Sequence, residues 1–403
     1  MARNARRAAR AAERAAKKHP KLVLGVIIFL VIVIAVCACL YFFVFREEVD
    51  NFLAGLKKPS DTDGTGTEIA AGDLAEISSA DLSIHFLELG NKYTGDCTLI
   101  KVGDTEVLID AGSRQNSAAA IVEYVSDYCT DGVLEYVIAT HAHQDHIAGF
   151  VGTTSAPGVF ESFEIGTIID FPRTNATTNI YKRYKEERDN AVAAGAVHYT
   201  ALECWNEEDG AQRSYALSES ITMDILYQKF YEEDTSDEND YSVCVLVSQE
   251  ENNYLFTGDL EAEGEQSLVN NNQLPECKLF KGGHHGSYTA STDALLSVIR
   301  PEIVCVCCCA GSPEYTVNVE NTFPAQAFID RVAKYTDQIY VTSLATDVDL
   351  EEETWEYTSM NGNIVVYTVR EGDTYSLKLW CSNNTTILKD TEWFQKNRTW
   401  GGD

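Results

Sequence analysis

The chain has 403 residues, of which 45% are hydrophobic, 10% aromatic and 23% charged, and this composition excludes an intrinsically disordered protein. Its 62 acidic and 31 basic residues give a net charge of −31. Residues 1–46 hold nine basic residues and one acidic residue, which leaves 22 of the 31 basic and 61 of the 62 acidic residues, a net charge of −39, for the rest. So acidic a body excludes the capture of duplex DNA by a general positive field. Any polyanion would have to be held by metal or by a local patch.

An uncharged stretch of 24 residues, 22–45, follows the basic N-terminal segment. At ~1.5 Å per residue, a helix of this length spans the ~30 Å hydrocarbon core of a membrane with some tilt. Eight basic residues precede it, so the positive-inside rule predicts a cytoplasmic N-terminus and an extracellular body. A cleaved signal peptide is the alternative, but the stretch exceeds the usual apolar region of about 7–15 residues and no A-x-A-like site follows. We therefore predict a basic cytoplasmic tail at 1–21 and a single-pass anchor in the cell membrane at 22–45.

Residues 46–80 are rich in Asp, Gly and Thr and predict an acidic, flexible stalk. After it, short apolar runs between polar turns predict strands, and longer amphipathic runs predict helices. The predicted strands are 84–89, 97–102, 106–110, 136–140, 221–227, 243–249, 253–257, 277–281, 303–309 and 339–343, and the predicted helices are 117–129, 261–270, 293–299 and 325–335. Mixed strands and helices indicate one layered α/β domain over residues 81–390, followed by a C-terminal tail at 391–403.

Twelve cysteines occur, and four of them crowd the run IVCVCCC at 303–309. Alternation along a strand would direct Cys305, Cys307 and Cys309 to one face and Cys308 to the other, so that neighbours cannot easily bridge. A thiolate metal cluster is the alternative interpretation, but the spacing differs from that of paired C-x-x-C knuckles. We predict a buried central strand in which the thiols act as small apolar groups.

The chain has eight histidines, and three of them belong to the sequence His141-Ala142-His143-Gln144-Asp145-His146, directly after a predicted strand. Imidazole and carboxylate groups are a ligand set that suits Zn²⁺, Mn²⁺ or Fe. If the loop wraps around the site, His141 and His143 can serve one ion while Asp145 and His146 turn toward a second. We therefore predict a metal site at this loop.

Two further loops at strand ends supply potential ligands. Lys281-Gly282-Gly283-His284-His285-Gly286-Ser287 follows an apolar strand, and its glycines allow the backbone to approach a site closely. The run Thr257-Gly258-Asp259 ends another strand in a carboxylate that could bridge two ions. Three loops that all supply ligands at strand ends favour a single catalytic centre. His198 is a further candidate ligand, although it falls in a strand-like run.

These motifs resemble those of a known family. THAHQDHIAG resembles the metal-binding signature of the metallo-β-lactamase superfamily, and TGD and HHGS fit its later motifs. More narrowly, IHFLELGNKYTGDCTLI, VLIDAG, ENDYSVCVLV and KGGHHGS resemble the extracellular hydrolase domain of the ComEC competence proteins, in the same order, from about residue 84 to 366. The resemblance implies an α/β fold of the αββα sandwich type, in which two mixed sheets face each other, helices lie outside and a metal site lies at one edge.

By position, the resemblance implies two divalent ions, Zn²⁺ or Mn²⁺, and a set of site residues. The implied ligands are His141, His143, Asp145, His146, Asp259 and His285, with His284 as the alternative to His285, and Asp145, His146 and Asp259 are the implied catalytic residues. Asp110 would brace the His-rich loop from behind, and Asp96 would line the edge of the site. One departure stands out: ComEC proteins usually have His near the site where this chain has Phe323.

The expected activity is hydrolysis by a hydroxide that two ions activate, since such ions lower the pKa of bound water toward ~7. The resemblance implies a nuclease-like phosphodiesterase, and the acidic body favours a short, single-stranded or cell-wall phosphodiester over duplex DNA. A single membrane span does not support a DNA-translocating channel. Two alternatives remain open: hydrolysis of a lactone, lactam or thioester, and a non-catalytic metal-binding surface protein.

Overall fold

The computed structural model of the protein describes residues 70–372 and 374–401, which belong to one compact unit that spans 66–403. The predicted cytoplasmic tail, the predicted transmembrane anchor and residues 46–69 of the predicted stalk lie outside the described residues. In the part of the chain that is described, none of the helices has the length and apolar character needed to cross a bilayer.

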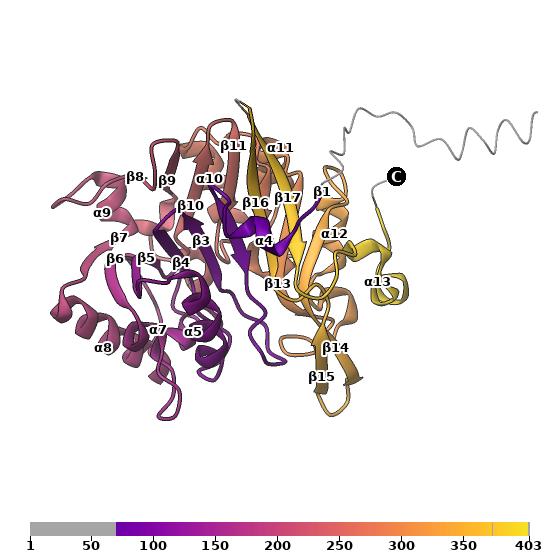
Figure 1. Cartoon of the computed structure of the whole chain (residues 1–403). Helices are drawn as coiled ribbons and strands as arrows, with labels where there is room; N and C mark the ends of the chain where they lie inside the picture. Colours follow the sequence, from indigo (N-terminus) through magenta and orange to yellow (C-terminus); the bar gives the residue numbers. More distant parts are fainter. Residues whose placement is uncertain (1–69, 373, 402–403) are drawn as a thin grey trace, which may run out of the picture. The chain divides into compact units, whose positions relative to one another are not determined.

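Two mixed β-sheets form the centre of this unit (Figure 1). In spatial order, the first sheet contains β1 (Ala70–Ala71), β17 (Thr374–Cys381), β16 (Ile364–Glu371), β2 (Ser83–Phe86), β3 (Thr98–Val102), β4 (Thr105–Ile109), β5 (Val133–Ile138), β6 (Glu164–Asp170) and β7 (Val197–Thr200). The second contains β15 (Thr354–Ser359), β14 (Ile339–Asp349), β13 (Ile303–Ala310), β12 (Leu279–Lys281), β11 (Asn252–Phe256), β10 (Cys244–Gln249), β9 (Ile221–Leu226) and β8 (Ser214–Ala216). The predicted α/β fold with two mixed sheets is confirmed.

Helices connect the strands. They are α4 (Leu74–Ile77), α5 (Ser117–Tyr128), α6 (Gln144–Val151), α7 (Val159–Ser162), α8 (Asn179–Ala194), α9 (Ala201–Asn206), α10 (Ala262–Asn271), α11 (Asp293–Ile299), α12 (Gln326–Val332) and α13 (Glu392–Asn397), with short 3-10 turns η1 (Lys229–Tyr231), η2 (Glu238–Tyr241), η3 (Gly283–Gly286), η4 (Val319–Asn321) and η5 (Leu388–Asp390). Figure 1 shows α5, α7 and α8 alongside strands β4 to β6. In α5, Ala118, Ile121 and Val125 recur at helical spacing and are buried, so one stripe of this helix packs on the core.

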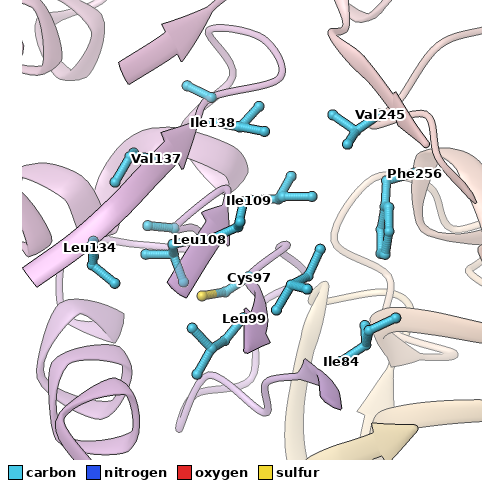
Figure 2. Close-up of a cluster of buried hydrophobic side chains, with 14 of the residues drawn as sticks. Ile84, Cys97, Leu99, Leu108, Ile109, Leu134, Val137, Ile138, Val245 and Phe256 are labelled. Atoms are coloured by element: carbon cyan, nitrogen blue, oxygen red, sulfur yellow. The ribbon is translucent and has the colours of Figure 1, made fainter. Parts of the chain in front are cut away.

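The main hydrophobic core combines side chains from both sheets. Figure 2 shows Ile84 and Ile109 of the first sheet opposite Val245 and Phe256 of the second. Each of these side chains is at most 4% exposed, so each contributes roughly 1.5–3 kcal/mol of burial free energy. A second cluster lies on the other face of the second sheet, where Phe328 and Ile329 of α12 pack against Val306. The two sheets are thus held together by a continuous core.

The cysteine-rich run forms β13, a fully buried strand between β12 and β14, as predicted. Cys305 and Cys307 belong to the core between the sheets, whereas Cys308 belongs to the cluster on the opposite face. Cys309 packs in a small separate cluster with Ala345 and Trp355, because the pairing with β14 shifts register between Val306 and Cys309. The cysteines of the described residues are free thiols.

At both ends of the domain, residues assigned from the sequence to the stalk and to the tail take part in the fold. In the predicted stalk, β1 pairs with β17, and Ile77 of α4 packs against Val365 and Tyr367. In the predicted tail, α13 buries Phe394. Ile77 and Phe394 hold these segments together with the β1–β17 pairing and the packing of Trp393 and Trp400 on the second cluster. Such contacts between distant parts of the chain are tertiary effects that local composition does not reveal.

Parallel pairing brings the functional loops to one edge. β4 and β5 are parallel in the first sheet, and β11, β12 and β13 are parallel in the second. The carboxyl ends of parallel strands meet at the same edge of a sheet. The residues that follow β4, β5, β11 and β12 are Asp110, the His141–His146 loop, Asp259 and the His284-His285 pair, so all four groups gather at this edge.

Candidate metal centre

The His-rich loop joins β5 to α6 and turns back at the start of the helix. His141 is buried, and His143 is the exposed N-cap residue of α6. Asp145 and His146 lie in the first turn of α6 and are both buried. The helical turn thereby directs Asp145 and His146 into the protein, while the extended residues before it carry His141 and His143. The His141–His146 loop therefore curves around one region, as the spacing of its histidines and Asp145 requires if they are to share a metal site.

His146 is held in one orientation by Asp110. Its Nδ1 lies 2.8 Å from Asp110 Oδ2, and the same carboxylate accepts hydrogen bonds from the Thr140 amide and hydroxyl at 2.7 and 2.8 Å. A proton on Nδ1 that is donated to Asp110 leaves the lone pair on Nε2, the form in which an imidazole binds metal. These contacts match the bracing position expected for Asp110. Its backbone has φ +59°, a left-handed conformation that is uncommon outside glycine.

His284 and His285 also have left-handed backbones, with φ +46° and +54°. Such strained residues cluster at functional sites, where the surrounding structure holds them in place. His285 Nδ1 donates to the Cys307 carbonyl at 2.9 Å, so its Nε2 faces the site. His284 is half-buried, and its Nδ1 lies 3.2 Å from Glu261 and from Thr289. Of the two, His285 is the buried residue that faces inward.

The imidazoles converge on Asp259. Asp259 Oδ2 lies 3.1 Å from His146 Nε2 and 3.3 Å from His285 Nε2, and the two Nε2 atoms are 3.3 Å apart. His284 Nε2 is farther from the same oxygen, at 3.8 Å. Asp145 Oδ2 lies 3.5 Å from His285 Nε2. Asp259 Oδ1 is buried and has no hydrogen-bond partner, which is unusual for a carboxylate oxygen and fits a cation-binding role.

The electrostatics of this cluster also favour a cation. Burial alone would lower the pKa of His146, but the carboxylates of Asp259 and Asp110 raise it to about 10. Burial would raise the pKa of Asp259, but His146 and His285 hold it well below its usual range. Without metal, the carboxylates therefore retain protons on the imidazoles. A divalent ion can replace these protons, so the residues present fit a bound metal.

His141 and His143 form a second, adjacent donor pair. His141 Nε2 lies 3.0 Å from His143 Nδ1, and the ring centroids of His141 and His146 are 4.1 Å apart. His198, the other candidate ligand, lies in β7 and contacts Asp170 Oδ1 at 2.8 Å instead. The structure thus brings together all the ligands expected from the sequence and leaves His198 outside the cluster.

Asp96 lies deeper in the site than its expected position at the edge. Potential ligand atoms of Asp96, His146, Asp259 and His285 all lie within 4.8 Å of one another. However, Asp96 contacts His146 and His285 at their Nδ1 atoms, at 3.7 and 3.3 Å, on the side away from Asp259. This position indicates a brace behind the two imidazoles rather than a direct ligand.

Lys281 was not singled out from the sequence, yet it lies in the centre of the site. Its side chain is 4% exposed, and its ammonium group pairs with Asp96 and lies 3.7 Å from Asp259 Oδ1. Burial alone would lower the pKa of Lys281, but Asp96 and Asp259 raise it above its usual range. The sequence feature that could have pointed to Lys281 is its position as a charged residue at the end of the otherwise apolar strand β12. The fixed positive charge offsets part of the negative charge of the carboxylates.

Tyr315 and Phe323 cover the site from a segment between β13 and α12. The Tyr315 hydroxyl donates to Asp145 Oδ2 at 2.6 Å, and its ring centroid lies 5.4 Å from that of Phe323. The Phe323 ring lies 5.8 Å from the rings of both His284 and His285. Phe323 therefore contributes an apolar wall beside the histidines, at the position where ComEC proteins usually have His. The sequence contains no local signal for the contact of Tyr315.

Backbone contacts lock three of the loops together. The Asp96 amide donates to the Asp145 carbonyl at 3.0 Å, and the Gly112 amide donates to the Asp96 carbonyl at 2.9 Å. Gly112 approaches so closely that a Cβ atom there would lie 1.7 Å from the Asp145 carbonyl oxygen. The glycine of the LIDAG motif is thus required by this close approach.

Comparison with protein families matches the chain to the metallo-beta-lactamase superfamily over residues 90–159 and 233–310. The first segment contains the His-rich loop, and the second contains Asp259 and both histidines of the HHGS motif. The predicted resemblance to this superfamily is therefore confirmed.

Individual proteins are similar at low identity. Recombination protein 2 of Haemophilus influenzae is 24% identical over 281 residues, which cover 68% of this chain and 29% of that protein, so the chain spans less than a third of the relative. Among solved structures, the metallo-beta-lactamase fold protein YhfI from Bacillus subtilis has 10% identity and a TM-score of 0.37, covering 66% of this chain and 97% of that one. The short form of human tRNase Z has 13% identity and a TM-score of 0.28, covering 64% and 91%.

Proposed function

Starting from the match to the metallo-β-lactamase superfamily, we propose that the chain is a metal-dependent hydrolase of phosphodiesters. The observation that carries this proposal is the convergence of His146 Nε2 and His285 Nε2 on Asp259 Oδ2, at 3.1 and 3.3 Å. Two buried imidazoles around a buried carboxylate form a donor set that suits Zn²⁺ or Mn²⁺. We propose His141, His143, Asp145, His146, Asp259 and His285 as the ligands of two such ions.

Divalent ions bound here would supply Lewis-acid activation of water and positive charge for the phosphoryl oxygens. Asp110 holds the His146 imidazole and the Cys307 carbonyl holds the His285 imidazole, each at Nδ1, and the Asp96 carboxylate lies beside both Nδ1 atoms. The pKa of Asp145 lies far below its usual range, because hydrogen bonding to His285 and the charge of His146 outweigh burial, so the carboxylate stays ionised and can orient the attacking water. The water oxygen adds to phosphorus, the ester P–O bond breaks, and the alcohol leaves with a proton.

A phosphodiester is the preferred substrate for two reasons. The motifs resemble the ComEC hydrolase domain, and one relative is named for recombination, a process that acts on nucleic acid. The net charge of −31 counts against tight binding of a duplex, so we propose a short or single-stranded phosphodiester.

We also propose that this hydrolase acts outside the cell membrane, anchored by residues 22–45 with residues 1–21 in the cytoplasm. The basic segment before the apolar stretch supports this orientation. A protease added to intact cells should release the acidic domain into the medium. Protection of that domain from the protease would contradict the orientation.

The activity is tested with the purified chain, Zn²⁺ or Mn²⁺, and a chromogenic phosphodiester, with Asp145→Ala in parallel. We expect turnover that requires metal and is lost in the variant. The same protein is assayed on a lactone, a lactam and a thioester. Turnover of one of these in place of the phosphodiester would move the proposal to that bond, and metal binding without any turnover would favour a non-catalytic metal-binding protein.

A further inference from the structure

Exposed apolar side chains gather on two segments of this fold. Within residues 70–372 and 374–401, nine large apolar side chains are exposed, and five of them lie on these segments. The segment 311–323 after β13 carries Tyr315, Val317 and Val319, and the tip of the β14–β15 hairpin carries Val348 and Leu350, at 39–52% exposure. Such clustering marks a binding surface more often than scattered single residues do.

A groove lies between these segments. Its volume is about 280 Å³, and its lining includes Val319, Val348 and Leu350 together with Ala345 and Trp393. Its one basic residue is Arg398, which is 6% exposed and donates to the Pro324 and Thr322 carbonyls. Thr346, Asp347 and Asn397 also line the groove. The groove therefore combines an apolar strip with polar side chains and one carboxylate, and it offers no free positive charge for a phosphate backbone.

The segment 311–323 belongs both to this groove and to the metal centre. Gly311 and Thr322 line the groove, and the Gly311 amide donates to the Phe323 carbonyl at 2.7 Å, which closes the base of the segment. Between these ends, Tyr315 donates to Asp145, and the Phe323 ring lies beside the histidines.

An ion pair holds this segment against the rest of the site. Glu314 pairs with Arg114 at 2.6 Å and accepts a hydrogen bond from the Thr94 amide at 2.8 Å. Thr94 lies two residues before Asp96, the brace behind His146 and His285. The segment 311–323, whose Val319 lines the groove, is thereby fixed next to the metal centre.

We propose that the groove binds an apolar substituent of the substrate, so that the enzyme cleaves amphipathic phosphodiesters. This inference rests on the proposed function and specifies its substrate class. The anionic diester group would bind at the metal centre. Its alkyl or aryl group would extend past Tyr315 into the groove and contact Val319 and Leu350. A diester with one negative charge also avoids the repulsion that a polyanion meets from a chain with a net charge of −31.

The test uses the full-length metal-loaded chain and a series of methyl, butyl and octyl p-nitrophenyl phosphodiesters, below their micelle-forming concentrations. The leaving group is the same throughout, so the series isolates the apolar substituent. We expect kcat/KM to rise with chain length, by up to about fourfold for each methylene that becomes fully buried. Val319→Asp and Leu350→Asp should lower the octyl-to-methyl ratio of kcat/KM toward one. Val192→Asp, which alters an equally exposed valine on α8, should keep the wild-type ratio.

Equal kcat/KM for the methyl and octyl diesters, or a ratio that survives both groove substitutions, would overturn the inference and leave the proposed function intact. A chain-length effect seen only above the micelle-forming concentration would also overturn it, since the surface would then bind aggregates. Absence of turnover for every diester would instead overturn the proposed function itself.

Discussion

Replacement of Lys281 by Met tests the charge balance of the site. The Lys281 side chain is 4% exposed, and its ammonium group pairs with Asp96 and lies 3.7 Å from Asp259 Oδ1. Removing one partner of a buried ion pair leaves an uncompensated charge, which costs about 3–5 kcal/mol. At roughly 2 °C per kcal/mol for a domain of this size, Lys281→Met should lower the Tm of the metal-free protein by about 6–10 °C.

Saturation with Zn²⁺ should shrink that loss to less than half, because the ion supplies positive charge to the same carboxylates. The assay is calorimetric unfolding of wild type and variant, with chelator and with metal. Lys278→Met is the matched control, since Lys278 pairs with Glu302 while both side chains are about one third exposed, and it should cost less than about 1 kcal/mol. An equal Tm loss with and without metal, or a loss as small as that of the control, would refute the charge-balance role of Lys281.

Three further predictions concern the loops around the cluster. Asp110→Ala should weaken metal binding about 10–100-fold, because His146 loses the acceptor for its Nδ1 proton. Competition with a chromogenic chelator measures the affinity, and an unchanged value would contradict this role of Asp110. Gly112→Ala should destabilise the fold by about 1–3 kcal/mol in urea, since a Cβ would lie 1.7 Å from the Asp145 carbonyl oxygen; a wild-type midpoint would contradict the close approach. Metal affinity should fall as the pH decreases below about 10, because His146 has a raised pKa and metal binding must displace its proton. Calorimetric titrations in buffers of different ionisation enthalpy measure this proton release. Binding without proton release would show that the imidazole is already neutral.

The parts of the site that the sequence predicts are those encoded locally. The spacing of His141, His143 and His146 and the position of Asp259 at the end of a strand predict ligands, and the parallel strands bring them together. The α/β class follows from the alternation of apolar strands with amphipathic helices. The sequence favours His285 and leaves His284 as the alternative, because the local motif does not show which of the two side chains the backbone turn directs inward.

Other features depend on contacts between residues far apart in the chain. Lys281 meets Asp96 across more than 180 residues, and Tyr315 meets Asp145 across 170, so no local pattern reports either contact. The same reason explains the boundaries of the domain, where α4 and α13 are short helices whose Ile77 and Phe394 are buried in clusters formed with distant parts of the chain.

We propose that His146, His285 and Asp259 bind a metal ion. X-ray diffraction from crystals grown with Zn²⁺ or Mn²⁺, collected on both sides of the absorption edge of the metal, tests it directly. We predict one anomalous peak between His146 Nε2, His285 Nε2 and Asp259, and a second beside His141 and His143. Anomalous peaks confined to other parts of the protein, with none at these histidines, would show that these residues do not form the metal site.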